Sequence, residues 1–499
     1  MSSIAQARQE VDRSVHAALD SVEKAGNGSA ADAEAAVWIG LLALGRALMT
    51  WFFALRAARY AANDVTYEHG GLSYIVSGRE ETEIGTRFGK VVFERPVGRV
   101  RGAPRWKHDL PLDRELGLVS GFTLPVVTTL TRLCAQMAFA SARDVFRSLF
   151  AWSPSSRAVL RMVDAMGAEA RPFLDEAPAP EDDGEVLVIT VDGKGAPTIS
   201  SAERQRRAQP HKPRGKNARH ARKARRRQQP RTRRGPGKKS KNAKMAAVGV
   251  LYTLRRTDDG KLDGPVNKRV YATFESYRAL FEWIHAEAVK RGYGTSKFAK
   301  VLFIADGAET LWSLQTEYFP DAEVCIDWYH IVEKLWAAGK ALCRGTRRHR
   351  KELEAWVAAQ KKRLRKGQLR QVLTEIQSAL SATAQTGPGN KYRRKVLGDV
   401  LAHFTKNAKR LRYAELRKQD LDIGSGVIEG AVRHVVGVRL DGPGMRWGRD
   451  RAEAVLHLRC VLLNGQWNAF EHHVARRPLK LAPQPIPART HDAVPQKAA

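Results

Sequence analysis

Cysteine is scarce in this chain of 499 residues, and its four copies are scattered. Cys134, Cys325, Cys343 and Cys460 lie far apart and form no CxxC pair, which argues against a zinc ribbon and against a disulfide framework. The chain is too long for one compact core, so we expect several domains that fold without covalent cross-links. A reducing compartment, the cytoplasm, fits this cysteine usage.

Long apolar runs without a charge are also missing. The N-terminal residues are polar and lack the apolar core of a signal peptide. One stretch, residues 35–55, is nearly long enough to span a bilayer, but Arg46 lies at its centre, where a charge is costly. We therefore expect no membrane segment and interpret the stretch as a buried or oligomerising helix. Its part from Trp38 to Leu55 is a candidate interface of a homo-oligomer.

Acidic residues are outnumbered, with 52 Asp and Glu against 85 Lys and Arg, which gives a formal charge of +33. Solubility needs far less charge than this, and neutralising phosphates is what such a surface does well, so the expected partner is double-stranded DNA. Residues 204–244 contain nineteen Lys or Arg and no acid. They predict a loop that is disordered or ordered by DNA, although a nonspecific segment with no part in positioning DNA remains an alternative. The candidate DNA contacts in it are Arg225, Arg226, Arg227, Arg233, Arg234, Lys238 and Lys239.

Changes in composition and periodicity divide the chain into successive regions. An N-terminal helical region (1–85) precedes a small hairpin with a helix-turn-helix-like DNA-binding region (86–170) and a linker rich in proline and acid (171–185). The α/β core follows in two parts, 186–340 with the basic loop 204–244, and 421–470, separated by a helical insertion at 341–420. The tail, 471–499, is expected to be disordered.

The hairpin is expected at Thr86 to Arg101, where β-branched residues alternate with charges. Phe139 to Gly167 predicts two short helices, the first capped by Ser141, the second starting at Ser153 before a proline and ending at Gly167.

Two arginines of the expected second helix, Arg157 and Arg161, lie four residues apart and therefore share a face. They could contact a DNA groove or its phosphates. An ordinary αα-hairpin without a DNA role is the alternative.

The core region begins with a buried strand, Glu185 to Gly195, that we expect to end at Asp192. Two more strands and a helix from Tyr277 with one apolar face follow, and then apolar strands that end at Asp306 and at Asp327. The order of three strands, helix, strand, helix, strand, helix is that of an RNase H-like layer.

Carboxylates at strand ends are the hard oxygen ligands that Mg²⁺ and Mn²⁺ prefer. Asp192 and Asp306 have that position, and Glu429, in the first turns of a helix that Ser425 can cap, could complete a site for two ions. The acids lie 114 and 123 residues apart, so only the fold could bring them together. The alternatives are that an aspartate before glycine forms a turn and that a glutamate near a helix start interacts with the helix dipole.

Other residues compete for a place in this site. Asp327, with His330 three residues later, is the alternative second ligand, or it simply caps the next helix. We rank Asp306 above it because a longer apolar strand and a turn of small residues flank Asp306. Arg446 and Trp447 could clamp or stack on DNA, although a tryptophan there is more often part of the core.

The motifs VITVDGKG, KMAAVGVLY, FIADGAETLWSLQTEYFPDAEVCIDWYHIVEKLW, GSGVIEG and MRWGRDRAEAVLHLRCVLLNGQW occur in this order. With them the chain resembles bacterial insertion-sequence transposases of the DDE class, closest to the ISKra group, from about Phe88 to Trp467. The resemblance implies an RNase H-like core with a helical insertion and an upstream DNA-binding region. It also implies that Asp192, Asp306 and Glu429 serve as first, second and third acid.

The expected function is therefore metal-dependent cleavage at transposon ends, followed by strand transfer into target DNA. Two alternatives remain open. The chain could be a metal-dependent nuclease that cuts without joining, or a DNA-binding protein that descends from a transposase and has lost its activity. The resemblance also keeps Asp327 and His330 as neighbours of the active site.

Overall fold

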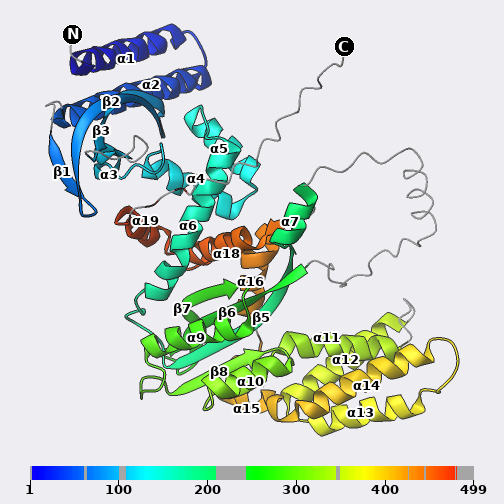
Figure 1. Ribbon diagram of the computed structural model, residues 1–499. Coiled ribbons are helices and arrows are strands. Elements are labelled where there is room, and N and C mark those ends of the chain that lie inside the picture. The colour runs from blue at the N-terminus through cyan, green and yellow to red at the C-terminus, as the bar shows by residue number, and fades with distance from the viewer. Residues whose placement is uncertain are drawn as a thin grey trace, which may run out of the picture. The chain divides into compact units, whose positions relative to one another are not determined.

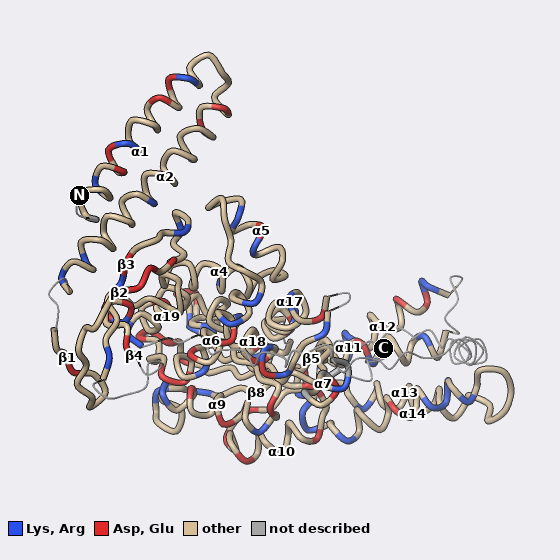
Figure 2. Tube along the Cα trace, turned by 45° about the horizontal axis from the view of Figure 1, so that its top comes forward, with Lys and Arg blue, Asp and Glu red and all other residues tan. Residues whose placement is uncertain are grey.

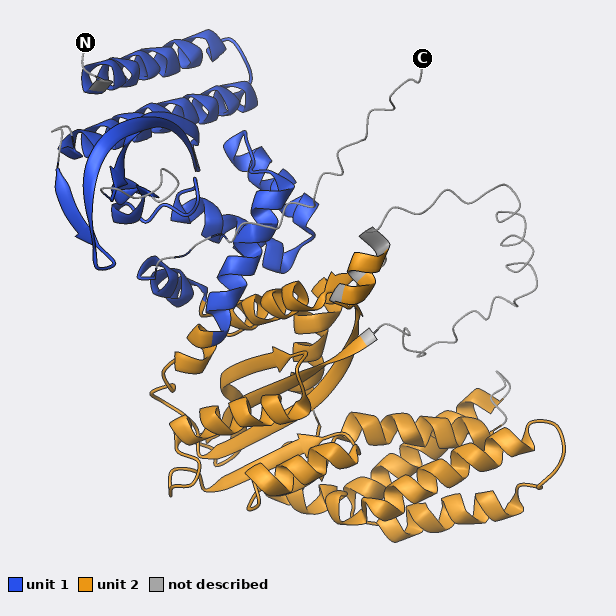
Figure 3. Cartoon of the chain, in the orientation of Figure 1, with its two compact units in different colours: residues 1–171, 467–499 blue, residues 172–466 orange. Residues whose placement is uncertain are grey.

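The computed structural model describes residues 3–60, 65–100, 108–208, 243–343, 349–424, 426–442, 445–477, 479 and 481. The chain forms two compact units (Figure 3). Unit 1 contains residues 1–171 and 467–499, and unit 2 contains residues 172–466. The first boundary falls within helix α6 (Ser156–Glu176), so part of the expected linker is helical.

Unit 1 opens with a helical hairpin, α1 (Ser3–Ala25) and α2 (Ala30–Ala57), drawn in dark blue in Figure 1. Ser29 starts α2, because its side chain accepts a hydrogen bond from the Asp32 amide while Asp32 accepts one from the Ser29 amide, a complete capping box. Phe53 of α2 then stacks on Phe93 of the following sheet, with 4.6 Å between ring centroids. This contact lies within the apolar core of the unit.

The sheet of unit 1 has the order β1 (Thr66–His69), β2 (Leu72–Thr86), β3 (Gly89–Arg99) and β4 (His108–Asp109), all antiparallel. The predicted hairpin at 86–101 is therefore misplaced. Thr86 ends the first strand of the hairpin and Gly89, at a positive φ of 120°, opens the second. The alternating pattern after Thr86 belongs to β3 alone, whose partner is the more polar β2.

Helices α3 (Pro111–Glu115), α4 (Leu124–Gln136), α5 (Phe139–Phe150), α6 and α19 (Trp467–Ala475) complete unit 1. Two helices lie where the sequence predicted them, but their ends differ. The residue before α5 is Ala138, which makes no capping hydrogen bond, so the predicted cap at Ser141 is wrong. At the start of α6, the hydroxyl of Ser155, and not that of Ser153, accepts a hydrogen bond from the Ala158 amide. Gly167 does not end α6, which continues to Glu176 because its apolar face remains buried. Helix α19 also occupies residues expected in the disordered tail.

Unit 2 is a mixed α/β unit built on a sheet with the order β7-β6-β5-β8-β9. Its strands are β5 (Val186–Ile199), β6 (Ala243–Arg256), β7 (Leu262–Thr273), β8 (Lys300–Ala305) and β9 (Glu323–Ile326). β6 runs antiparallel to both of its neighbours, β5 and β7, whereas β8 and β9 run parallel to β5. A short strand, β10 (Trp447–Gly448), pairs with the end of β5.

Helices α9 (Tyr277–Arg291), α10 (Glu309–Tyr318), α16 (Gly426–Val432) and α18 (Arg449–Leu463) accompany this sheet, α9 against β6 and β7, and α16 against β5 and β6. Ser276 caps the start of α9, because its hydroxyl accepts a hydrogen bond from the Ala279 amide at 3.1 Å. Helix α7 (Ser201–Ala208) follows β5, and residues 209–242, which contain all seven candidate contacts of the basic loop, lie outside the described residues.

A helical region separates β9 from α16. It consists of α11 (Trp328–Leu342), α12 (Arg350–Arg365), α13 (Leu369–Ala382), α14 (Asn390–Lys406) and α15 (Tyr413–Lys418). Helices α11 to α14 form a bundle in which α14 returns to pack on α11 (Figure 1). The bundle therefore brings residues near position 400 back to the strand ends.

Candidate functional site

The parallel pairing of three neighbouring strands stops in register, and on each strand an acid follows the last residue of this pairing. Val191 of β5 pairs with Ala305 of β8, and Ala305 pairs with Ile326 of β9. The residues that come next are Asp192, Asp306 and Asp327. Parallel pairing thus places three carboxylates at one edge of the sheet. β5 itself continues to Ile199, paired with β6, so the prediction that this strand ends at Asp192 is wrong.

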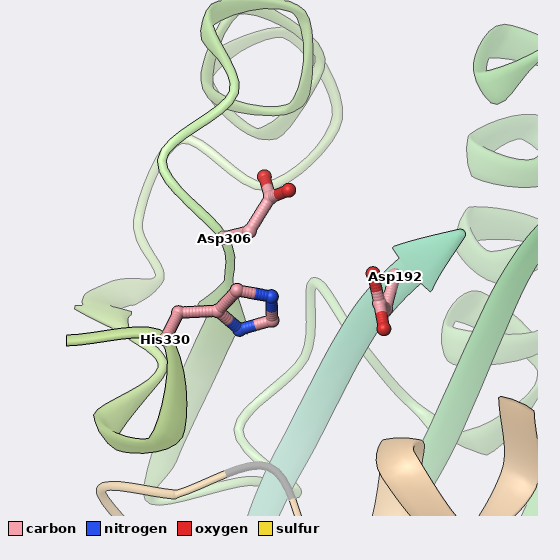
Figure 4. A group of neighbouring side chains, drawn as sticks. All are labelled: Asp192, Asp306 and His330. Carbon is pink, nitrogen blue, oxygen red and sulfur yellow. The ribbon is translucent and has the colours of Figure 1, made fainter. Parts of the chain in front are cut away.

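Two of these acids converge with a histidine. One ligand atom each from Asp192, Asp306 and His330 lies within 4.8 Å of the other two. Figure 4 shows the His330 imidazole reaching from the first turn of α11 between the carboxylates of Asp306 and Asp192. The three side chains come from β5, the turn after β8 and α11, which are far apart in sequence.

Asp327, unlike the other two acids, is fully buried and caps a helix. It is 1% exposed and caps α11, accepting bonds from the backbone amides of Tyr329 and His330 at 3.3 and 3.2 Å. Its carboxylate also lies 2.6 Å from Nδ1 of His330. A carboxylate bound to one ring nitrogen fixes the orientation of an imidazole and directs the other nitrogen, Nε2, outward. Asp327 therefore positions His330 toward the two strand-end acids.

The charges of the cluster depend on one another. Hydrogen bonding to Asp327 raises the pKa of His330 to about 9, against the opposing effect of burial. Burial raises the pKa of Asp192, while the hydrogen bond from the Gly193 amide and the charge of His330 lower it. The neighbouring charges of Asp306 and Asp327 raise the pKa of Asp192 further. A positive charge stabilises carboxylates that share a half-buried site, and His330 supplies one. Groups with shifted pKa values gather more often at functional sites than elsewhere, which makes this cluster a candidate site.

No family model matches the chain, and no curated protein matches its sequence. Among solved structures, the chain is similar to one in the Drosophila P element transposase strand transfer complex, with 9% sequence identity and a TM-score of 0.30. That match covers 69% of this chain and 93% of the other. A similarity this low supports no assignment of activity.

Glu429 lies apart from the three-residue cluster. It is exposed, in the first turns of α16, and is not among the residues whose ligand atoms meet. Burial, the charge of Asp327 and, more weakly, that of Asp192 raise the pKa of Glu429, so its carboxylate is within electrostatic reach of the cluster. The proposed cap of this helix, Ser425, lies outside the described residues.

Tyr277 is a site residue that the sequence did not reveal, because it fits the apolar face of α9. Its hydroxyl lies against Gly193, where a Cβ atom would come within 2.3 Å of it. Burial and the charges of Asp306 and Asp192 raise the pKa of Tyr277 to about 12. Gly193 thus leaves room for the close approach of a tyrosine, and its backbone does not have a positive φ.

His403 of α14 reaches the site from the helical insertion. A Cβ atom on Gly307 would come within 2.1 Å of Cε1 of His403. Nε2 of His403 is buried and has no hydrogen-bond partner among the described residues. Burial and the charge of Lys334 lower the pKa of His403 to about 4, so the ring is neutral at physiological pH. In the sequence, the only trace of these two contacts is the glycine after each aspartate. Gly193 leaves room for Tyr277, and Gly307 leaves room for His403.

The remaining DNA-binding candidates differ in exposure and in their hydrogen bonds. Trp447 is 5% exposed, donates from Nε1 to the Leu440 carbonyl and lies under the Arg439 guanidinium, so the prediction that it stacks on DNA is wrong. Arg446, next to it, is exposed. Arg157 is also exposed, whereas Arg161 donates to the carbonyl of Leu481 at 2.6 Å.

Proposed function

We propose that this chain is a DNA transposase that cleaves phosphodiester bonds at transposon ends and joins the resulting 3′ ends to target DNA, with divalent metal ions as cofactors. The observation that carries the proposal is the convergence of Asp192, Asp306 and His330 at the ends of parallel strands. The order of the sheet, three antiparallel strands followed by two parallel ones, supports an RNase H-like core. The motifs that resemble the ISKra group support the same assignment.

The donor set fits a divalent cation. Asp192 and Asp306 offer carboxylate oxygens from two different strands, and the half-buried position of Asp192 makes its charge costly without a compensating cation. Asp192 and Asp306 would hold Mg²⁺ or Mn²⁺, with Glu429 as the proposed third ligand. Two such ions, when bound, supply activation of the attacking oxygen and stabilisation of the leaving one.

The chain's own residues supply the rest of the site. Asp327 holds His330 in one orientation, and His330 presents its second nitrogen beside the acids. Tyr277 and His403 contact the two glycines that follow Asp192 and Asp306, and so fix the backbone that carries these acids. The formal charge of +33 supports double-stranded DNA as the partner, bound by counterion release, in the bacterial cytoplasm.

The test is a cleavage and joining assay on DNA that carries the ends flanking the gene, with Mg²⁺ or Mn²⁺. Asp192→Asn, Asp306→Asn, Asp327→Asn and Glu429→Gln each remove one charge and little volume. Asp321→Asn, which changes an exposed acid before β9, is the matched control. We expect Asp192→Asn, Asp306→Asn and Glu429→Gln to bind DNA as wild type does and to lose both reactions, while Asp321→Asn retains them.

Each contrary result has a defined meaning. Cleavage without any joined product would identify a metal-dependent nuclease. Binding without either reaction in wild type would identify a DNA-binding protein that has lost its activity. An active Asp306→Asn with an inactive Asp327→Asn would move the second metal ligand to Asp327, and an active Glu429→Gln would remove the proposed third ligand.

A further inference from the structure

A cavity of about 1,100 Å³ lies between α11 and α14, in the helical insertion of unit 2. We call it the insertion cavity. Among the residues that line it are Glu333, Trp336, Lys340, Tyr392 and Arg393. Its volume is near the upper end of the range for sites that bind small molecules. Two aromatic rings and two cations therefore share a cavity large enough for a ligand.

The insertion cavity begins about one helical turn from the acid cluster. Glu333 follows His330 by three residues and Lys340 follows Glu333 by seven, so the three lie along one side of α11. Burial raises the pKa of Glu429, and the charges of Asp327 and Glu333 raise it further, so Glu333 is within electrostatic reach of the proposed third ligand. From Glu333 to Lys340 the cavity wall extends about 10 Å along α11, away from the cluster. A strand bound at the cluster therefore has the cavity close beside it.

A guanidinium group ties the two walls of the cavity together. Arg393 of α14 donates from Nε to the Ala341 carbonyl of α11 at 2.7 Å, and from Nη1 to Oδ1 of Asn390 at 3.3 Å. A guanidinium has five N–H donors, so Arg393 is held in place and still keeps donors for a ligand. Because this bond joins α11 to α14, the cavity is formed before a ligand binds.

The aromatic side chains of the cavity are accessible to a ligand. Tyr392 is 70% exposed, and Trp336 is partly exposed. Aromatic rings beside cations bind single-stranded nucleic acid, because the rings stack on the faces of bases while the cations contact phosphates. In a duplex the neighbouring base pairs cover those faces, so the rings favour an unpaired nucleotide.

The charge of the helical insertion also fits a polyanion. Residues 328–406 contain 18 Lys or Arg and five Asp or Glu. Figure 2 shows Lys and Arg along α12, α13 and α14. Within the cavity, Glu333 lies at the end near the cluster, whereas Lys340 and Arg393 lie at the far end. A phosphate is therefore stabilised at the far end of the cavity, where the cations are.

We propose that the insertion cavity binds an unpaired nucleotide of the DNA strand that leaves the acid cluster. The base stacks on Trp336 and Tyr392, and a phosphate lies against Lys340 and Arg393. The identity of this strand rests on the proposed function, whereas the binding can be measured without cleavage. Holding one nucleotide outside the duplex fixes the strand beside the acids and so positions the reacting phosphate.

The test is photo-cross-linking of the full chain, without divalent metal, to a short oligothymidylate that carries one 5-iododeoxyuridine. A short probe in about 0.3 M salt limits binding to the other basic surfaces. Mass spectrometry of the cross-linked peptides should identify Trp336 or Tyr392. Trp336→Ala and Tyr392→Ala should each weaken the affinity for the probe by about 5- to 150-fold, the range for one stacked base. Because Tyr392 is so exposed, Tyr392→Ala should fold as wild type does even if Trp336→Ala does not.

A lysine variant tests the phosphate contact separately. Lys340→Met should lower the slope of log affinity against log salt by about 0.7, the value for one phosphate of a single strand. Lys351→Met and Trp38→Ala are the matched controls, because both side chains are exposed and neither lines the cavity. Both controls should bind the probe as wild type does.

Three results would overturn the proposal. One is cross-linking only outside the cavity, with unchanged affinity of the folded Tyr392→Ala variant. Another is equal competition by a duplex of the same length. The third is equal competition by thymidine monophosphate, which would assign the cavity to a free nucleotide. Cross-links in the cavity of a wild-type chain that neither cleaves nor joins DNA would instead contradict the proposed function and support the binding of an unpaired nucleotide.

Discussion

Replacing Gly307 with alanine tests whether the helical insertion supports the acid-bearing turn after β8. The added methyl group would lie 2.1 Å from Cε1 of His403, with both ring nitrogens at 3.0–3.1 Å. A contact this short forces the ring of His403 or the turn itself to move. Overpacking of this kind costs about 1–3 kcal/mol of folding free energy. For a unit of this size, that corresponds to a fall in Tm of roughly 2–6 °C.

The assay is a thermal melt of the full chain, followed for the transition of unit 2, in a double-mutant cycle with His403→Ala. Removing the imidazole opens the space that the new methyl group needs, so Gly307→Ala should cost less than about 0.5 kcal/mol in the His403→Ala background. Gly398→Ala is the matched control, because Gly398 lies in the same helix as His403 and has no atom within 4 Å of its Cβ position. This control should stabilise α14 by about 0.5–1 kcal/mol, the ordinary helix preference of alanine over glycine.

Two results would refute this reasoning. An unchanged Tm for Gly307→Ala would mean that the ring of His403 moves away at no cost. An equal loss in the wild-type and His403→Ala backgrounds would mean that glycine is required by the turn itself and not by the contact with α14.

The nearness of Asp192 and Asp306 could be predicted because each follows a local apolar run. Such a run indicates a buried strand, and the parallel pairing of β5 with β8 then places the two acids side by side, although β5 continues beyond Asp192. The reason for the glycine after each acid could not be predicted in this way. Neither Gly193 nor Gly307 has a positive φ. Each instead accommodates a side chain from a helix far along the chain.

Features that depend on tertiary contacts were the ones that the sequence did not supply. His403 lies 97 residues after Asp306 and reaches it only because α14 returns along α11. Tyr277 follows the apolar period of α9, so its polar contact was hidden. The cap of α6 was predicted at Ser153, yet Ser155 provides it, because local capping signals two residues apart cannot be ranked without the backbone.

Trp447→Ala should lower the free energy of unfolding by about 3–5 kcal/mol, as for other buried tryptophans, while DNA affinity of the folded protein stays unchanged in a binding titration. Burial raises the pKa of Glu453, but the charge of the neighbouring His457 and the hydrogen bonds from Thr273 and Phe274 outweigh this effect and hold the pKa below its ordinary value of 4.5. Its stabilisation is therefore present above pH 4.5 and lost as the pH falls through the lowered pKa, so Glu453→Gln should lower Tm at pH 7 and lessen its fall in acid. Asp327→Asn keeps a side-chain cap for α11 but weakens the hydrogen bond to His330, which should lower the free energy of unfolding by about 1.5–3 kcal/mol. Asp327→Ala also removes the cap, which should lower the free energy of unfolding by a further ~1 kcal/mol. Thermal melts should rank wild type above Asp327→Asn above Asp327→Ala, and equal values for the two variants would show that Asp327 contributes nothing as a cap.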